Sequence, residues 1–86
     1  MISDHEYNRF FWASRRGMLE LDLILVPFVE QRLRDLDDVD VQRYRNLLEC
    51  EDTELFAWFL QRQSPEDREL AGIVEQILAN ARTPRT

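Results

Sequence analysis

The sequence predicts an all-α fold, a compact five-helix bundle that forms a single domain over residues 1–86. Three observations lead to this prediction. A chain of 86 residues has room for one hydrophobic core. Two glycines and three prolines leave few positions where regular structure must be interrupted. Apolar residues recur at intervals of three and four along five segments, which is the period of a helix with one buried face.

Start signals help to place these helices. Ser3 with Glu6 fits a capping box, Asp52 is a candidate cap for the fourth helix, and Ser64-Pro65 combines a capping hydroxyl with a first-turn proline. We expect a frayed polar tail at the C-terminus. The expected boundaries are approximately 4–14, 18–35, 40–49, 53–61 and 65–81, with the tail at 83–86.

The second expected helix carries apolar residues on two sides. One stripe consists of Leu21, Ile24, Leu25 and Phe28, and the other of Leu19, Leu23 and Val26. The second stripe has three interpretations: core, partner surface or homodimer contact. Pro27 lacks an amide hydrogen, so we expect a kink or a break there.

The charge and hydropathy of the chain disfavour nucleic-acid binding and membrane insertion. The formal net charge is −6, and all eleven basic residues are arginine. A net acidic chain is a poor candidate for binding nucleic acid, which requires a local basic excess. The longest apolar run, 23–29, is far shorter than the ~20 residues that a membrane-spanning helix needs. We therefore expect a cytoplasmic protein that is not inserted in a membrane and is a monomer when free.

The residues needed for catalysis or metal binding are sparse. His5 is the one histidine and Cys50 the one cysteine, so no Cys/His metal site can form. Acidic neighbours disfavour a Cys50 thiolate. Gly17 and Gly72 stand alone, so neither a dinucleotide fingerprint nor a P-loop is present. The sequence therefore predicts a non-enzymatic protein with no catalytic residues, no metal and no cofactor in a standard pocket.

The segment 12–22 is the most informative, and it has two interpretations. Arginines, a glycine and an acid around a turn are ordinary helix punctuation, with Arg16 and Glu20 pairing at the surface. Alternatively, the outward face of the first helix binds a partner, because exposed tryptophan beside arginine is typical of interfaces. That face, opposite the core-facing aromatic residues, would contain His5, Arg9, Trp12 and Arg16. Trp12 could also lie at the edge of this face and pack partly on the second or fourth helix.

The segment Arg16-Gly17-Met18-Leu19-Glu20 matches an Arg-Gly-x-x-Glu motif. Trp12 and Arg15 precede it and Leu21-Asp22 follow; Pro27-Phe28 and the stretch 47–59 extend the match. On this pattern the chain resembles the bacterial succinate dehydrogenase FAD assembly factors, the SdhE or flavinator type. Thr53 departs from the family pattern, in which proline is often found at this position, and the last helix matches only in its apolar period.

The resemblance implies a five-helix protein that binds the flavoprotein subunit of succinate dehydrogenase, or of the related fumarate reductase. It would promote covalent attachment of FAD to a histidine of this client. FAD is then the client's cofactor, and whether this chain touches FAD stays open. By position in the motif, the partner-binding residues would be Arg16, Gly17 and Glu20, with Arg9, Trp12, Arg15 and Asp22 beside them. Gly17 would allow close approach of the client backbone.

Two other functions are alternatives to this one. A small acidic helical protein could be an antitoxin or another regulatory interaction module, which would bind a toxin instead of a flavoprotein. A DNA reader using Arg43, Tyr44 and Arg45 is less consistent with the acidic composition.

Overall fold

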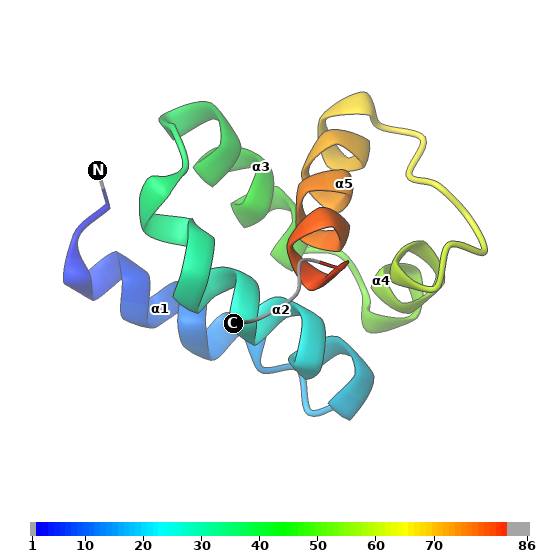
Figure 1. The fold of residues 1–86 in the computed structure, drawn as a ribbon, viewed down its shortest axis with the longest axis horizontal. Helices are drawn as coiled ribbons and strands as arrows, with labels where there is room; N and C mark the ends of the chain where they lie inside the picture. The colour runs from blue at the N-terminus through cyan, green and yellow to red at the C-terminus, as the bar shows by residue number, and fades with distance from the viewer. Residues whose placement is uncertain (1, 83–86) are drawn as a thin grey trace.

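The computed structural model describes residues 2–82, and over that range it is helical without strands (Figure 1). The all-α, single-domain prediction is confirmed. The tail prediction for 83–86 falls outside the described residues. The elements are α1 (Asp4–Ser14), α2 (Leu19–Arg32), the short 3₁₀ helix η1 (Leu33–Asp35), α3 (Asp38–Leu48), α4 (Asp52–Phe59) and α5 (Arg68–Arg82).

Helix α2 packs against α1, α4 and α5, while α3 packs against α5 and α1 (Figure 1). The core follows from this arrangement. Leu25, Phe28 and Val29 of α2 are fully enclosed, and Ile73 and Ile77 of α5 are enclosed with them. Burying an aliphatic side chain of this size stabilises the fold by roughly 1.5–3 kcal/mol. The periodic stripes of the second and fifth helices are thus the faces that hold the bundle together.

Tyr44 of α3 joins α1 and α2 through its ring. Its centroid lies 5.9 Å from that of Phe10 and 5.5 Å from that of Phe28. Its hydroxyl meets Ser14 Oγ at 2.6 Å, and Ser14 Oγ donates to the carbonyl of Phe10 at 2.8 Å. Because the hydroxyl hydrogen of Ser14 is used in that bond, Tyr44 is the donor to Ser14. A fully buried tyrosine therefore has its polar end satisfied, as burial requires.

Helices α4 and α5 do not start where predicted because other side chains take the capping role. Helix α5 begins at Arg68, and not at Pro65, because the Asp67 carboxylate accepts from the amide of Glu69 at 2.8 Å. Helix α4 begins at Asp52, with Glu51 as its N-cap and the Glu54 carboxylate accepting from the Glu51 amide at 3.2 Å. Asp52 is thus a first-turn residue, which leaves its carboxylate available for another partner.

The second and third helices also differ in detail. Helix α2 passes through Pro27 without a break and ends at Arg32, where the 3₁₀ turn follows. Helix α3 begins at Asp38 because the Asp37 carboxylate accepts from the amide of Asp40 at 2.8 Å.

One of the two hydrogen bonds of the predicted α1 capping box is present. Ser3 Oγ accepts from the amide of Glu6 at 3.1 Å, and the Glu6 carboxylate forms an ion pair with Arg45.

Candidate partner-binding site

The connection between α1 and α2 turns on Gly17, whose φ of +82° lies in the left-handed region. Side chains rarely adopt this conformation, so glycine suits it. The position is exposed, and a Cβ built on Gly17 would meet no atom within 4 Å beyond its two chain neighbours. The glycine is therefore needed for its backbone angle, and not for packing within the molecule. The space in front of it is open to a partner.

The Arg16 side chain does not point to that open space. It is 16% exposed and runs back toward the start of α4, where its Nε donates to Asp52 Oδ1 at 2.7 Å. Nη1 donates to the carbonyls of Leu48 at 2.9 Å and Ala13 at 3.3 Å. Nη2 donates to the carbonyl of Cys50 at 2.8 Å. All three guanidinium nitrogens are thus used within the protein.

These acceptors explain why an arginine occupies this position. The last turn of an α-helix leaves carbonyls without intrahelical partners, and its end carries partial negative charge. Arg16 donates to such carbonyls at the ends of α1 and α3, and it also donates to the carboxylate of Asp52. The fork of guanidinium donors can bind several acceptors at once. The interpretation in which Arg16 pairs with Glu20 is wrong, because the ion pair of Arg16 is with Asp52.

Asp22 holds the same turn from the other side. Its Oδ1 accepts from the backbone amide of Arg16 at 2.7 Å, while its own amide donates to the carbonyl of Met18 at 3.0 Å. Asp22 therefore fixes the backbone immediately before Gly17 from the first turn of α2. Of the predicted site residues, Arg16 and Asp22 are the two whose side chains hold this turn by hydrogen bonds.

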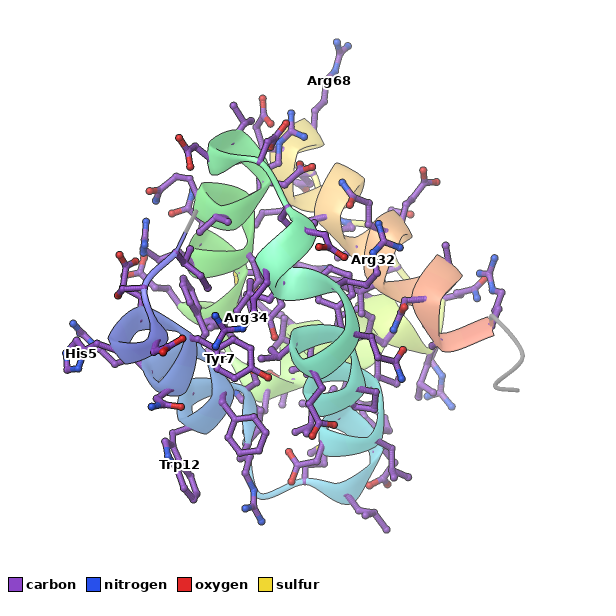
Figure 2. All side chains as sticks on the ribbon, turned by 60° about the vertical axis from the view of Figure 1, so that its left-hand side comes forward. His5, Tyr7, Trp12, Arg32, Arg34 and Arg68 are labelled. Atoms are coloured by element: carbon purple, nitrogen blue, oxygen red, sulfur yellow. The ribbon has the colours of Figure 1, made fainter. Side chains whose placement is uncertain are left out.

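A group of exposed side chains surrounds the turn, and we call it the corner surface. Trp12 is 64% exposed and projects from α1 (Figure 2), with the guanidinium carbon of Arg15 at 5.5 Å from its ring centroid. Leu19 and Leu23 of α2 are exposed to a similar degree, so these two members of the second apolar stripe are not core. The corner surface comprises Trp12, Arg15, Gly17, Leu19, Glu20 and Leu23.

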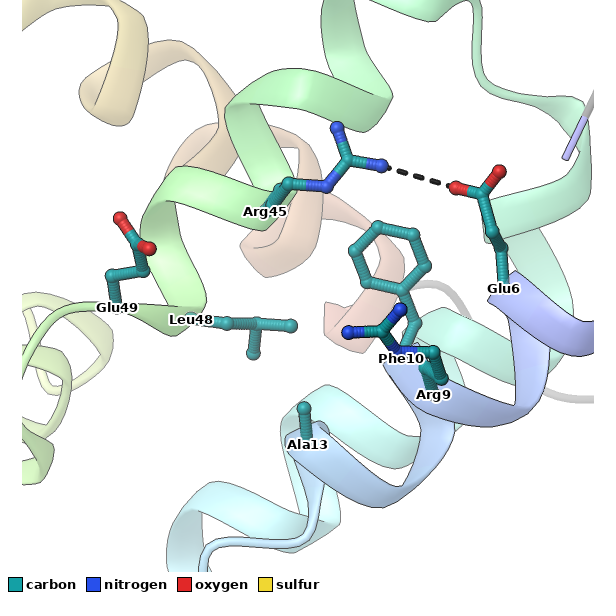
Figure 3. A pocket seen from close by; sticks show the side chains of 7 residues that line it. All are labelled: Glu6, Arg9, Phe10, Ala13, Arg45, Leu48 and Glu49. Carbon is teal, nitrogen blue, oxygen red and sulfur yellow. Dashed lines mark hydrogen bonds and ion pairs between the residues drawn. The ribbon is translucent and has the colours of Figure 1, made fainter.

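A groove of about 390 Å³ between α1 and α3 contains the remaining predicted residue, Arg9 (Figure 3). Its lining includes Phe10, Ala13 and Leu48, and the ion pair between Arg45 and Glu6 spans it at 3.1 Å. The groove is adjacent to Arg16, which binds the carbonyls of two lining residues. The sequence gives no sign of this groove, because the groove forms only where α1 and α3, which are distant in sequence, lie side by side.

Cys50 and the acidic side chains are the remaining candidates for a nucleophile or a metal site. Burial and the neighbouring Glu54 raise the pKa of the Cys50 thiol, which makes it a poorer nucleophile. Across residues 2–82 no three histidine, cysteine or acidic side chains are grouped to bind a metal ion. Over the same range, no helix is both long enough and apolar enough to span a bilayer.

The three candidate DNA-reading residues do not form an exposed set. Tyr44 is buried, Arg43 is ion-paired with Asp40 and Glu69, and Arg45 with Glu6. Arg43, Tyr44 and Arg45 therefore lack the shared free surface that this interpretation requires.

The fold and the site define a class: a small all-helical protein that presents an exposed apolar and charged corner held by partly buried polar contacts. Comparison with known proteins names the family. Residues 8–81 match the family described as the flavinator of succinate dehydrogenase, and the chain belongs to this family. It is 55% identical over 78 residues to the FAD assembly factor SdhE of Pseudomonas savastanoi pv. phaseolicola, covering 91% of this chain and 93% of the relative. The SdhE proteins of Pseudomonas aeruginosa and Shewanella oneidensis are 53% and 51% identical, covering 91% and 85% of this chain and 93% and 89% of those proteins.

Proposed function

We propose that this protein binds the flavoprotein subunit of succinate dehydrogenase in the bacterial cytoplasm and promotes covalent attachment of FAD to it. The related fumarate reductase subunit is a second client of the same kind. Membership of the flavinator family and the names of its relatives support this role. FAD is the cofactor of the client. The reacting groups belong to the client as well, since the residues described here offer no nucleophile or metal site near the corner surface.

The observation that carries the proposal is the open space at Gly17. The glycine adopts a left-handed angle at an exposed turn, and apart from its two chain neighbours no residue of this protein lies within 4 Å of where its Cβ would be. A client backbone can approach this point more closely than it could approach any other residue type. Trp12 and Leu19 flank the turn with exposed apolar area, and Arg15 and Glu20 add charge for orientation. Such a combination is typical of the centre of a protein interface.

This protein contributes to the reaction by positioning the reacting groups of the client. Binding at the corner surface holds the client so that its histidine and the isoalloxazine ring of FAD meet in a reactive arrangement. Correct placement of two reacting groups can lower a barrier by roughly 7–11 kcal/mol without any catalytic group being supplied. A rigid docking surface suits this role because little conformational freedom is lost on binding.

The test is complex formation with the apo flavoprotein subunit, measured by titration calorimetry. Glu20→Arg reverses a charge within the corner surface, and Glu30→Arg makes the same change on an exposed position of the same helix as a matched control. We expect the wild type and Glu30→Arg to bind equally and Glu20→Arg to bind at least tenfold more weakly. No binding by the wild type would refute the function. Equal binding by Glu20→Arg would refute the assignment of the surface.

A further inference from the structure

We propose that Arg16 is a positioning residue, which sets the shape of the corner surface from within the protein and does not itself contact the client. This inference rests on the proposed function, and it assigns the arginine of the Arg-Gly-x-x-Glu segment a different role from the glycine beside it. The two neighbours point to different environments. Gly17 faces open space, and the Arg16 side chain is 16% exposed.

The hydrogen-bonding capacity of Arg16 supports this division of roles. Its Nε, Nη1 and Nη2 all donate to acceptors of this chain, at 2.7 to 3.3 Å. To form a bidentate pair with a client carboxylate, the guanidinium would have to break its hydrogen bonds to Asp52 and to helix-end carbonyls. Those carbonyls would then lose their partners at a partly buried site, which is unfavourable. The hydrogen-bond donors of the Arg16 side chain are therefore already used in the free protein.

The contacts of Arg16 also explain how it can act on the corner surface. Through Ala13 it binds the end of α1, immediately after Trp12, and through Asp52 it binds the start of α4. Its backbone amide is held by Asp22 of α2. Arg16 thereby fixes the end of α1 relative to the turn at Gly17 and to a helix distant in sequence. A surface held in its bound shape binds more tightly because less freedom is lost.

Substitution of Asp52 tests the positioning role of Arg16, because Asp52 contacts Arg16 and lies outside the corner surface. The experiment measures affinity for the apo flavoprotein subunit with Arg16→Lys, Asp52→Ala and the double variant. Lysine keeps the charge but cannot reproduce the guanidinium fork. Arg43→Lys is the matched control, since Arg43 also bridges two helices by ion pairs, to Asp40 within α3 and to Glu69 on α5.

We expect Arg16→Lys and Asp52→Ala each to weaken binding about tenfold, while Arg43→Lys binds as the wild type does. The double variant should be no weaker than the weaker single variant, because both changes remove one network. In the free protein, the amide resonance of Gly17 should shift in Arg16→Lys and in Asp52→Ala. Flavinylation by both variants should recover at saturating concentration, because the defect lies in docking.

Two results would overturn the proposal while leaving the proposed function intact. If Arg16→Lys weakens binding and Asp52→Ala does not, Arg16 contacts the client directly. If both variants lose thermal stability and yet bind the client with wild-type affinity, the network serves the fold alone. Failure of the wild type to bind would instead refute the proposed function, and this inference would fall with it.

Discussion

The hydroxyl oxygens of Ser14 and Tyr44 lie 2.6 Å apart in the core, although 30 positions separate them in the chain. Ser14 is the last residue of α1, and Tyr44 lies in the middle of α3. The bond therefore fixes where α1 ends, directly before the turn that carries Arg16 and Gly17. A buried polar contact far from the surface thus helps to set the direction in which the chain enters the candidate site.

Removing either partner of this bond should cost different amounts of stability. Tyr44→Phe keeps the ring packing, and Ser14 still donates to Phe10, so we expect a loss of about 1 kcal/mol. Ser14→Ala leaves the buried Tyr44 hydroxyl without a partner and should cost about 2 kcal/mol. Urea unfolding measures both values. The opposite order would show that Tyr44 is not the donor in this bond.

Stability should also decline in alkaline solution because of Tyr44. Burial raises the pKa of Tyr44 above its ordinary value of 10.0. The unfolded chain then releases this proton at a lower pH than the folded protein does, so the free energy of unfolding decreases above pH 10. The limiting slope is about 1.4 kcal/mol per pH unit. Unfolding measured between pH 9 and 11.5 should show a steeper decline in the wild type than in Tyr44→Phe. Parallel curves would contradict the assignment to Tyr44.

Leu23 and Leu25 are a matched pair on α2, with side chains of the same kind in opposite environments. Leu25 is 0% exposed and Leu23 is 64% exposed. Leu25→Ala should lower the free energy of unfolding by about 2–5 kcal/mol through lost burial and a cavity. Leu23→Ala should change it by less than about 0.5 kcal/mol. Comparable losses in the two variants would mean that α2 is rotated relative to the structure described here.

Trp12 tests the corner surface without disturbing the fold. Its side chain is 64% exposed, so Trp12→Ala should change stability by less than about 0.5 kcal/mol. Affinity for the apo flavoprotein subunit should fall at least tenfold, as expected for a tryptophan at the centre of an interface. Val39→Ala is the control, since Val39 is an exposed apolar residue at the start of α3, outside the corner surface. Equal affinity of the Trp12 and Val39 variants would exclude Trp12 from the interface.

The sequence was sufficient to predict the helices and much of the core, because both depend on local periodicity. Leu21, Leu25 and Phe28 of one stripe are buried, and Ile24 of the same stripe packs against the core. Helix starts were predicted less well where several acidic residues compete to cap. At the start of α5 the capping carboxylate is that of Asp67, although Ser64-Pro65 had been the predicted start. At α4 the N-cap is Glu51, although Asp52 had been the predicted cap.

The internal arrangement of the candidate site could not be predicted from the sequence. One interpretation of the helical spacing placed both Trp12 and Arg16 on the outward face of α1. Trp12 is exposed there, whereas the placement of Arg16 is wrong, because its side chain is 16% exposed and turns inward. The inward orientation of Arg16 could not be deduced, because Asp52, Leu48 and Cys50 come close to it only when α1 and the α3–α4 connection pack together. Spacing along one segment shows which residues are neighbours in sequence. It does not show which distant carbonyl a guanidinium will bind.

The most direct test of the central claim is the covalent flavin content of the succinate dehydrogenase flavoprotein subunit, measured by in-gel fluorescence. Cells lacking this protein are compared with cells that carry the wild type or Gly17→Asn. Asparagine tolerates a positive φ better than other side chains, so this variant should fold, which circular dichroism checks. The account predicts that flavinylation falls without the protein, returns with the wild type and does not return with the folded variant. Unchanged flavinylation in cells lacking the protein, or full restoration by Gly17→Asn, would contradict it.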